Sequence, residues 1–219
     1  MNNTLTWEHH LYGNQDNKGL IDKLSLRAGL ITKLSRIMPS DRLKIMAEGI
    51  FFSVLNYGIE LYANTWSVMT HDEHLRNSTA YTKEDNRKLQ VLVNKVLRSL
   101  TGLTFDTSTK LLHIRSNQLS VHQRCAYFSL VSIFKTLKRG QPHYHKSRFS
   151  QRSDHQIETR NRASFNIDYR LSISRCSFFY RSSKLFKLLP DDIVMIDKIE
   201  HFKSKVKDWV QKNVSLAPL

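Results

Sequence analysis

The stretch SDRLKIMAEGIFFSVLNYGIELY, residues 40–62, carries the clearest structural pattern in the chain. Its apolar side chains recur at intervals of three and four residues, at Leu43, Met46, Ala47, Ile50, Phe51, Val54, Leu55 and Ile59. This spacing places them on one face of an α-helix. We therefore expect a helix that has Ser40 as its N-cap and packs its apolar face against other helices.

The residues before Pro39 predict a second long helix, over 17–38, with apolar side chains on two faces. One face carries Leu20, Leu24, Ala28, Ile31 and Met38, and the other carries Leu26, Leu30, Leu34 and Ile37. An apolar surface this wide predicts neighbours on two sides.

Further apolar stripes and capping residues predict five more helices along the chain. The first is expected from Thr82 to a stop at Gly102, the second around 107–114, and the third from a capping box of Ser120 and Gln123 to Gly140. The fourth is expected over 177–188, before Pro190. The fifth is expected from Asp197, with Glu200 as its capping partner, to 213. The stretch SFNIDYRLSIS, within 164–174, is a candidate for one short strand.

Composition agrees with a mainly α fold. The 219 residues include only 7 glycines and 4 prolines, which disfavours an all-β fold rich in turns. We expect a short remnant at 1–16, a helical bundle at 17–140, a basic loop at 141–176 and two C-terminal helices at 177–213.

The formal net charge of +15 is unevenly distributed. Residues 1–80 contain 8 Lys+Arg and 8 Asp+Glu, whereas 81–219 contain 26 and 11. The densest positive region, 135–189, has 13 basic residues and 3 acidic ones. A split of this kind favours an anionic partner, most commonly nucleic acid, because phosphates release counterions on binding. A basic surface that serves only solubility is the alternative.

No catalytic or metal-binding pattern accompanies this charge. The sequence has no glycine-rich phosphate loop, no paired-cysteine zinc spacing and no G-x-S-x-G motif. His71 and His74, and likewise His143 and His145, fit solvated loops better than metal sites. We expect no catalytic residue, no metal and no cofactor.

The sequence also indicates where the protein resides. Cys125 and Cys176 fit small buried side chains in a reducing compartment, and the N-terminus lacks the pattern of a signal peptide. No apolar run approaches the ~18 residues of a membrane span. We expect an intracellular protein, nuclear or cytoplasmic, with no membrane partner.

Six segments in order resemble the thumb and C-terminal region of reverse transcriptases from non-LTR (LINE-like) retrotransposons. The first three are GLITKLSRIMPSDRLKIMAEGIFFSVLNYGIELY, which has a Tyr-Gly signature near its end, then LQVLVNKVLRSLTGL, and then LLHIRSNQLSVHQR, which contains a Leu-Ser-Val-x-x-Arg element. The last three are IETRNR, which contains a Thr-Arg motif, then SFFYRSSKLFKLLPDDI and HFKSKVKDWV. The stretch LTWEHH fits the residues that follow the last palm hairpin in that family. The resemblance implies a thumb-like helical domain over 17–140.

The chain departs from the family where the chemistry lies. Polymerase activity in the family depends on a palm domain with a Tyr-x-Asp-Asp motif, and that motif is absent here. The primer-grip hairpin and the endonuclease domain are absent too. The resemblance therefore predicts a fragment without polymerase activity, which is a truncated copy, a reading frame cut at Met1 or an inactive degenerate remnant.

The resemblance also implies partners and contact residues. A thumb holds the template–primer duplex, so RNA or an RNA–DNA hybrid is the expected partner. The candidate nucleic-acid-binding residues are Lys33, Arg36, Lys88, Lys95, Arg98, Arg160, Arg181, Lys184 and Lys187. Arg181 has a second interpretation, in which it bridges the basic loop to the last helices. Phe178 and Phe186 fit core positions better than base-stacking ones.

A protein–protein function is the alternative. In it, the helices assemble in trans with a separate palm-and-fingers polymerase subunit. Its sign would be an exposed apolar patch on the first two helices, where a palm would pack.

Overall fold

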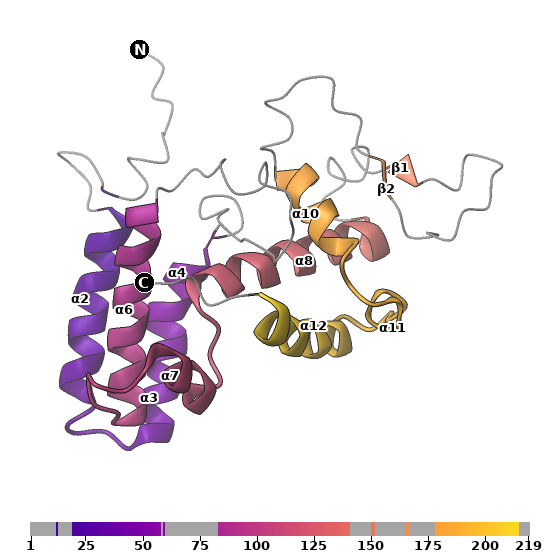
Figure 1. The fold of residues 1–219 in the computed structure, drawn as a ribbon. Helices are drawn as coiled ribbons and strands as arrows, with labels where there is room; N and C mark the ends of the chain where they lie inside the picture. Colours follow the sequence, from indigo (N-terminus) through magenta and orange to yellow (C-terminus); the bar gives the residue numbers. More distant parts are fainter. Residues whose placement is uncertain are drawn as a thin grey trace, which may run out of the picture. The chain divides into compact units, whose positions relative to one another are not determined.

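The described residues are mainly α-helical, as the sequence predicts (Figure 1). The structure is a computed structural model, and it describes residues 12, 19–57, 59, 83–140, 150–151, 165–166 and 178–214. These fall into two compact units: the first holds the described residues up to Arg124, and the second holds those from Cys125 onward. The boundary between the two units falls within a helix, between Arg124 and Cys125.

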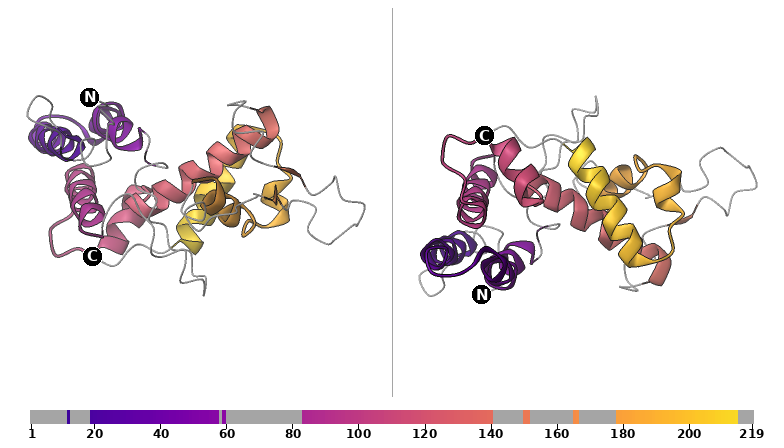
Figure 2. Two further views of the ribbon diagram at one scale, coloured as in Figure 1. Left: turned by 90° about the horizontal axis from the view of Figure 1, so that it is seen from above. Right: turned by 90° about the horizontal axis from the view of Figure 1, so that it is seen from below.

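The first unit is built from three packed helical segments and a short fourth helix. Its elements are α2 (Leu20–Leu34), α3 (Ser40–Ala47), η1 (Glu48–Phe52), α4 (Ser53–Asn56), α6 (Lys83–Thr101), α7 (Thr109–Ser116) and the start of α8 (Val121–Arg139). Seen end-on, α2, the α3–η1–α4 segment and α6 lie beside one another (Figure 2). The apolar stripes form the core between them, with Leu24, Ala28 and Ile31 on α2 and Val93, Val96 and Leu97 on α6 all fully buried.

One turn of the helix in residues 40–56 is wider than an α-helical turn. In this π-helical turn, η1, the backbone N–H of Ser53 donates to the carbonyl of Glu48, five residues earlier. The extra residue turns two consecutive side chains, Phe51 and Phe52, into the core, where their rings meet edge to face at 5.2 Å. Side chains bind neighbouring carbonyls: the Ser53 hydroxyl donates to Gly49, and the Arg27 guanidinium donates to Ile50 at 2.5 Å.

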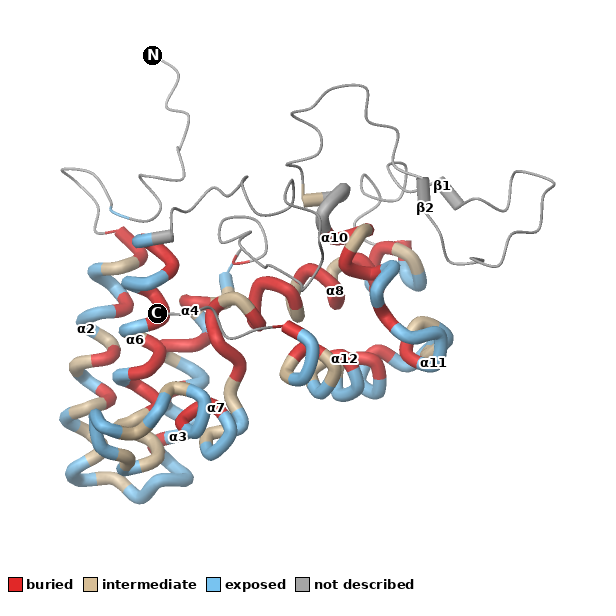
Figure 3. The backbone as a smooth tube through the Cα atoms, in the orientation of Figure 1, coloured by how far each residue is buried: buried red, intermediate tan, exposed pale blue. Residues whose placement is uncertain are grey.

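The prediction of two buried faces on the first helix was wrong. Leu26 is 62% exposed and Leu30 47%, and Ile37, beyond the helix end, is 82% exposed. Only the face with Leu20, Leu24, Ala28 and Ile31 is buried, and pale segments mark the opposite side of α2 in Figure 3. The reason is tertiary: within the described residues, α2 packs mainly on α6 and the α3–η1–α4 segment, which lie against its other face.

Helix ends confirm some predicted caps and correct others. Ser120 and Gln123 form the predicted capping box, since each backbone N–H donates to the other side chain. Gly102 and Gly140 follow their helices with φ of 69° and 63°, as predicted. Ser40 is not a cap: Pro39 precedes the helix, and the Ser40 hydroxyl donates to the carbonyl of Leu100. Asp197 is not a cap either, since Lys198 occupies that position and Asp197 pairs with Lys138 at 2.6 Å.

The second unit contains the rest of α8 and the C-terminal helices. These are α10 (Phe178–Phe186), α11 (Asp191–Val194), which the sequence did not predict, and α12 (Ile199–Asn213). The rings of Phe134 and Phe202 stack at 3.9 Å, and Phe186 lies 6.5 Å from Phe202, so Phe186 is a core residue as expected. Two short strands, β1 (Ser150–Gln151) and β2 (Phe165–Asn166), pair antiparallel, and β2 lies in the predicted strand segment.

Candidate nucleic-acid interface

Three helix ends come together in the first unit, and five exposed basic residues lie on or next to the segments that meet there. The hydroxyls of Thr32 and Ser99 lie 3.0 Å apart and join the end of α2 to the end of α6. The bond from Ser40 to Leu100 joins the start of α3 to the same end of α6. We call this place the α2–α3 corner, and its exposed cations are Lys33, Arg36, Arg42, Lys44 and Lys95.

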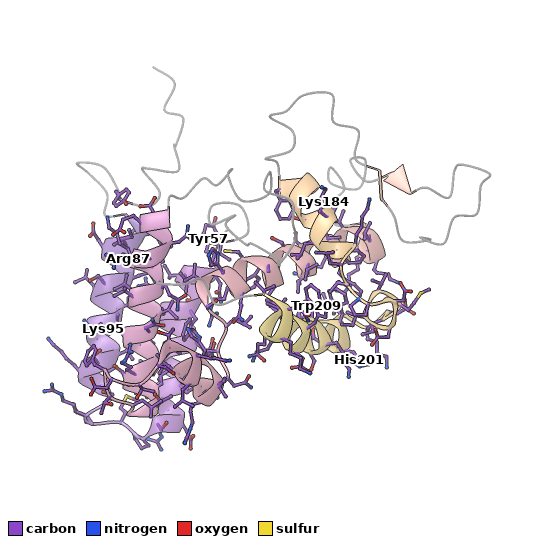
Figure 4. All side chains as sticks on the ribbon, viewed as in Figure 1. Tyr57, Arg87, Lys95, Lys184, His201 and Trp209 are labelled. Atoms are coloured by element: carbon purple, nitrogen blue, oxygen red, sulfur yellow. The ribbon has the colours of Figure 1, made fainter. Side chains whose placement is uncertain are left out.

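The corner unites predicted and unpredicted candidates. Lys33 and Lys95 come from different helices, yet Lys33 follows Thr32 and Lys95 lies one turn before Ser99. Figure 4 labels Lys95 on α6. Arg42 and Lys44 were not among the predicted residues; in sequence they follow Pro39 by three and five residues, at the start of α3.

Most exposed cations of the described residues lack an acidic partner. Ion pairs form between Arg87 and Glu84, Lys138 and Asp197, and Lys203 and Glu200. Apart from Lys88, which contacts Tyr12, the exposed basic residues that make no ion pair among the described residues are Lys23, Lys33, Arg36, Arg42, Lys44, Lys95, Lys110, Arg115, Lys135, Arg139, Lys198, Lys205 and Lys212. Their positive charge is thus available to an anion in solvent.

Lys88 lies near the other end of α6 and is engaged by an aromatic side chain. Its Nζ lies 5.2 Å from the centre of the Tyr12 ring and donates to the Tyr12 hydroxyl at 3.4 Å. That hydroxyl donates to the buried carboxylate of Asp85. The hydrogen bond to Asp85 raises the pKa of Tyr12 above its ordinary value. Lys88 is therefore separate from the corner and helps to hold Tyr12 on α6.

Arg98 faces the protein's own backbone. Its Nε donates to the carbonyl of Thr104, and its Nη2 donates to the carbonyls of Phe105 and Thr107, each at 3.3 Å. These contacts brace the loop between α6 and α7, which returns toward α6 after Gly102. The sequence, in which Arg98 was a candidate nucleic-acid-binding residue, did not reveal this bend.

The remaining predicted residues belong to the second unit. Lys184 on α10 is half-buried and Lys187, just beyond that helix, is exposed. Arg160, and the side chain of Arg181, lie outside the described residues, so both interpretations of Arg181 stand. Exposed Lys198, Lys205 and Lys212 follow α12 at seven-residue intervals, about 10 Å apart along one face. His201, labelled in Figure 4, lies between the first two.

A buried polar network joins α6, α7 and the start of α8. The Gln90 side chain has its Oε1 2.9 Å from the backbone N–H of Val121, which fixes the orientation of the amide. Its Nε2 then donates to Asn94 Oδ1 at 2.8 Å and to His113 Nε2 at 3.0 Å. Because His113 Nε2 accepts, its Nδ1–H donates to the carbonyl of Gln118 at 2.9 Å. Burial lowers the pKa of His113, which suits the neutral ring.

The segment LSVHQR, residues 119–124, holds the same junction together. The buried Arg124 guanidinium donates to the carbonyl of Leu119 at 3.1 Å, to Asn56 Oδ1 at 3.1 Å and to Gln118 Oε1 at 2.5 Å. It also lies over the Phe52 ring, 4.2 Å from its centre. Burial lowers the pKa of His122 to about 4. This motif is structural in the first unit, and its basic residue is not displayed to solvent.

Other kinds of site find no support in the part of the chain that the structure describes. No group of three or more His, Cys, Asp or Glu side chains there could hold a metal ion. None of the described helices is long and apolar enough to cross a membrane. The histidine pairs at 71–74 and 143–145 lie outside the described residues.

Comparison with known proteins adds no relative. No family model, curated protein or solved structure matches the chain. The geometry and the charge of the described residues therefore carry the functional argument.

Proposed function

We propose that the chain binds nucleic acid by phosphate contacts, as a fragment related to the thumb and C-terminal region of a non-LTR reverse transcriptase and without polymerase activity of its own. The observation that carries the proposal is the set of exposed Lys and Arg side chains without an acidic partner among the described residues. Phosphate contacts of this type position a ligand without reading its sequence. RNA or an RNA–DNA hybrid is the expected ligand.

The α2–α3 corner is the best-defined part of this surface. Lys33 and Lys95 lie on helices held by the Thr32–Ser99 contact, so their backbone positions are fixed, and Arg36 lies in the turn just after α2. A cation in the last turn of a helix also interacts favourably with the helix dipole. This interaction gives a structural explanation for the presence of Lys33 only. It does not account for Lys95, which lies more than one turn before the end of α6.

Salt dependence tests the proposal. Binding of a labelled 20-base-pair RNA–DNA hybrid is measured by fluorescence anisotropy between 50 and 400 mM salt. Each neutralised phosphate contributes about 0.9 to the slope of log affinity against log salt. The triple variant K33Q/R36Q/K95Q should therefore lower the slope by about 2–3 and weaken binding at every salt concentration.

A matched control uses the same helices at their opposite ends. The double variant K23Q/R87Q is compared with K33Q/K95Q, since both remove two charges from α2 and α6. Arg87 already pairs with Glu84, so the control should change the slope by less than about 1. A flat affinity for the wild-type chain over this salt range would refute nucleic-acid binding. Equal effects of the two doubles would refute the corner.

A specific observation favours the second candidate function, assembly in trans with a separate polymerase subunit. Leu26 and Leu30 lie one turn apart on the solvent side of α2 and are exposed, as that alternative requires. The variant L26Q/L30Q should keep the helix, because neither side chain belongs to the core, and should abolish concentration-dependent association in sedimentation experiments. A wild-type chain that stays monomeric up to high concentration would argue against this candidate. Primer extension by the purified chain should yield no product in either case.

A further inference from the structure

The loop between α6 and α7 presents an aromatic ring to solvent. Phe105 is 84% exposed, more than any other large hydrophobic side chain among the described residues. A single exposed apolar side chain is common in proteins, so exposure alone indicates nothing. What distinguishes Phe105 is the way the loop and the ring are held.

Polar contacts fix the loop from behind. Arg98 donates to three of its carbonyls, those of Thr104, Phe105 and Thr107. The Thr107 backbone N–H donates to Thr104 at 3.3 Å, and the Ser108 hydroxyl accepts from Leu111 N–H as the N-cap of α7. A loop held at both ends loses little conformational freedom when a ligand binds it.

The same guanidinium lies against the ring. Arg98 Cζ is 5.3 Å from the centre of the Phe105 ring, a cation–π contact. One face of the ring is thus backed by the cation, and the exposed remainder is open to a flat partner. Two exposed lysines flank the loop in sequence, Lys95 one turn before Arg98 and Lys110 in the first turn of α7, against the single carboxylate of Asp106.

We propose that Phe105 is a stacking platform for an unpaired base of single-stranded RNA or DNA, with Arg98 as the positioning residue behind the ring. Every base has a π-face, and stacking on an aromatic side chain is a major source of affinity for single strands. Lys95 and Lys110 would then neutralise the phosphates that flank the base. The inference rests on the proposed function and deepens it, because it adds an unpaired base to a surface that otherwise reads only phosphates.

Abasic oligonucleotides separate stacking from charge. Binding of a labelled dT12 strand to the full chain is measured by anisotropy beside a 12-residue strand that has the same sugar–phosphate backbone but no bases. The variant F105A should weaken dT12 binding by about 5- to 100-fold. It should leave the affinity for the abasic strand and the salt slope unchanged. The conservative variant F105W should bind dT12 at least as tightly as the wild type.

The control is I37A, which removes another exposed apolar side chain, 82% exposed, from the same unit. It should leave both affinities within about twofold, because no ring is lost. Unchanged dT12 binding by F105A, or an equal loss on the two strands, would overturn the stacking platform while phosphate binding stood. A wild-type chain with no salt-dependent binding to either strand would overturn both proposals.

The role of Arg98 has its own readout. The variant R98K keeps the charge but cannot reach three carbonyls at once. It should increase hydrogen exchange in residues 102–108 and weaken dT12 binding more than abasic binding. Increased exchange with unchanged dT12 affinity would restrict Arg98 to a structural role and overturn its assignment as the positioning residue.

Discussion

Replacing Gln90 by methionine should destabilise the first unit by about 3 kcal/mol. The Gln90 side chain is nearly buried and satisfies three groups from three helices: Asn94 Oδ1 on α6, His113 Nε2 on α7 and the Val121 N–H at the start of α8. Methionine has similar length and no amide. Each buried group left without a partner costs about 1–3 kcal/mol. The more favourable transfer of the thioether into the interior offsets part of this cost.

Hydrogen exchange is the appropriate assay because the chain has two units and need not unfold in one step. A loss of about 3 kcal/mol corresponds to roughly a 150-fold rise in the opening equilibrium. Amides of α6 and α7 should therefore exchange about 100-fold faster in Q90M, whereas those of α12, in the other unit, should change only a few-fold. The control V91M introduces the same side chain at the adjacent exposed position and should stay within about 0.5 kcal/mol.

The variant Q90E tests the direction of these hydrogen bonds. A carboxylate keeps the acceptor for Val121 but cannot donate to His113, so it should hold His113 protonated and raise the pKa of that ring in the folded state. A raised folded pKa stabilises the protein below the unfolded value of about 6.5 and loses that contribution as pH rises. Q90E should thus become less stable from pH 6 to pH 8. Exchange in α6 within threefold of wild type for Q90M, or a Q90E profile parallel to the wild type, would refute the network.

Two further predictions concern the same junction. Burial lowers the pKa of both His113 and His122, so the unfolded state binds more protons below pH 6.5. The stability of the fold should therefore be full above that pH and fall toward pH 4, by at most about 3 kcal/mol for His122. The variant H122Q should flatten this profile in urea unfolding. The variant R124K should lower the free energy of unfolding by about 2–4 kcal/mol, because an ammonium group cannot bind Leu119, Asn56 and Gln118 together or cover the Phe52 ring. A decrease below about 1 kcal/mol in the same measurement would contradict the geometry.

Helical periodicity predicted where most helices lie, but it identified the buried face correctly for only some of them. The stripe from Leu43 to Leu55 was identified because apolar spacing reports directly on one helix face. The π-helical turn was not foreseen, although Phe51 and Phe52 are adjacent and both buried, which one regular face cannot accommodate well. In the helix expected around 107–114, the apolar residues Leu111 and Ile114 are exposed, because Leu112 and His113 face the core instead.

The polar residues were harder to predict because their burial depends on a partner helix. Gln90 and His113 resemble surface residues in a helical pattern, and only the packing of α7 on α6 removes them from water. The role of Arg98 depends on the bend after Gly102, which has a positive φ. Gly102 was predicted as a helix stop, but the contacts that the bend gives Arg98 were not predicted. Periodicity treats each helix alone, whereas these contacts arise between elements.

The Leu-Ser-Val-x-x-Arg element changes what the family resemblance can support. Ser120 caps α8, Val121 donates to Gln90, and Arg124 binds three groups around the start of α8 while covering Phe52. Each of these residues has a structural reason to be present in this fold, so the segment carries no information about phosphate binding. The proposal of nucleic-acid binding must therefore stand on the α2–α3 corner and on Phe105.

The two sets of residues predict opposite behaviour. Substitutions at the junction should lower stability and reduce binding only through unfolding. Substitutions of exposed Lys33, Lys95 or Phe105 should lower affinity at constant stability, because these side chains make no core contacts. If corner variants instead destabilised the fold as strongly as R124K, the exposed cations would be part of the structure rather than of an interface, and phosphate binding would lose its main support.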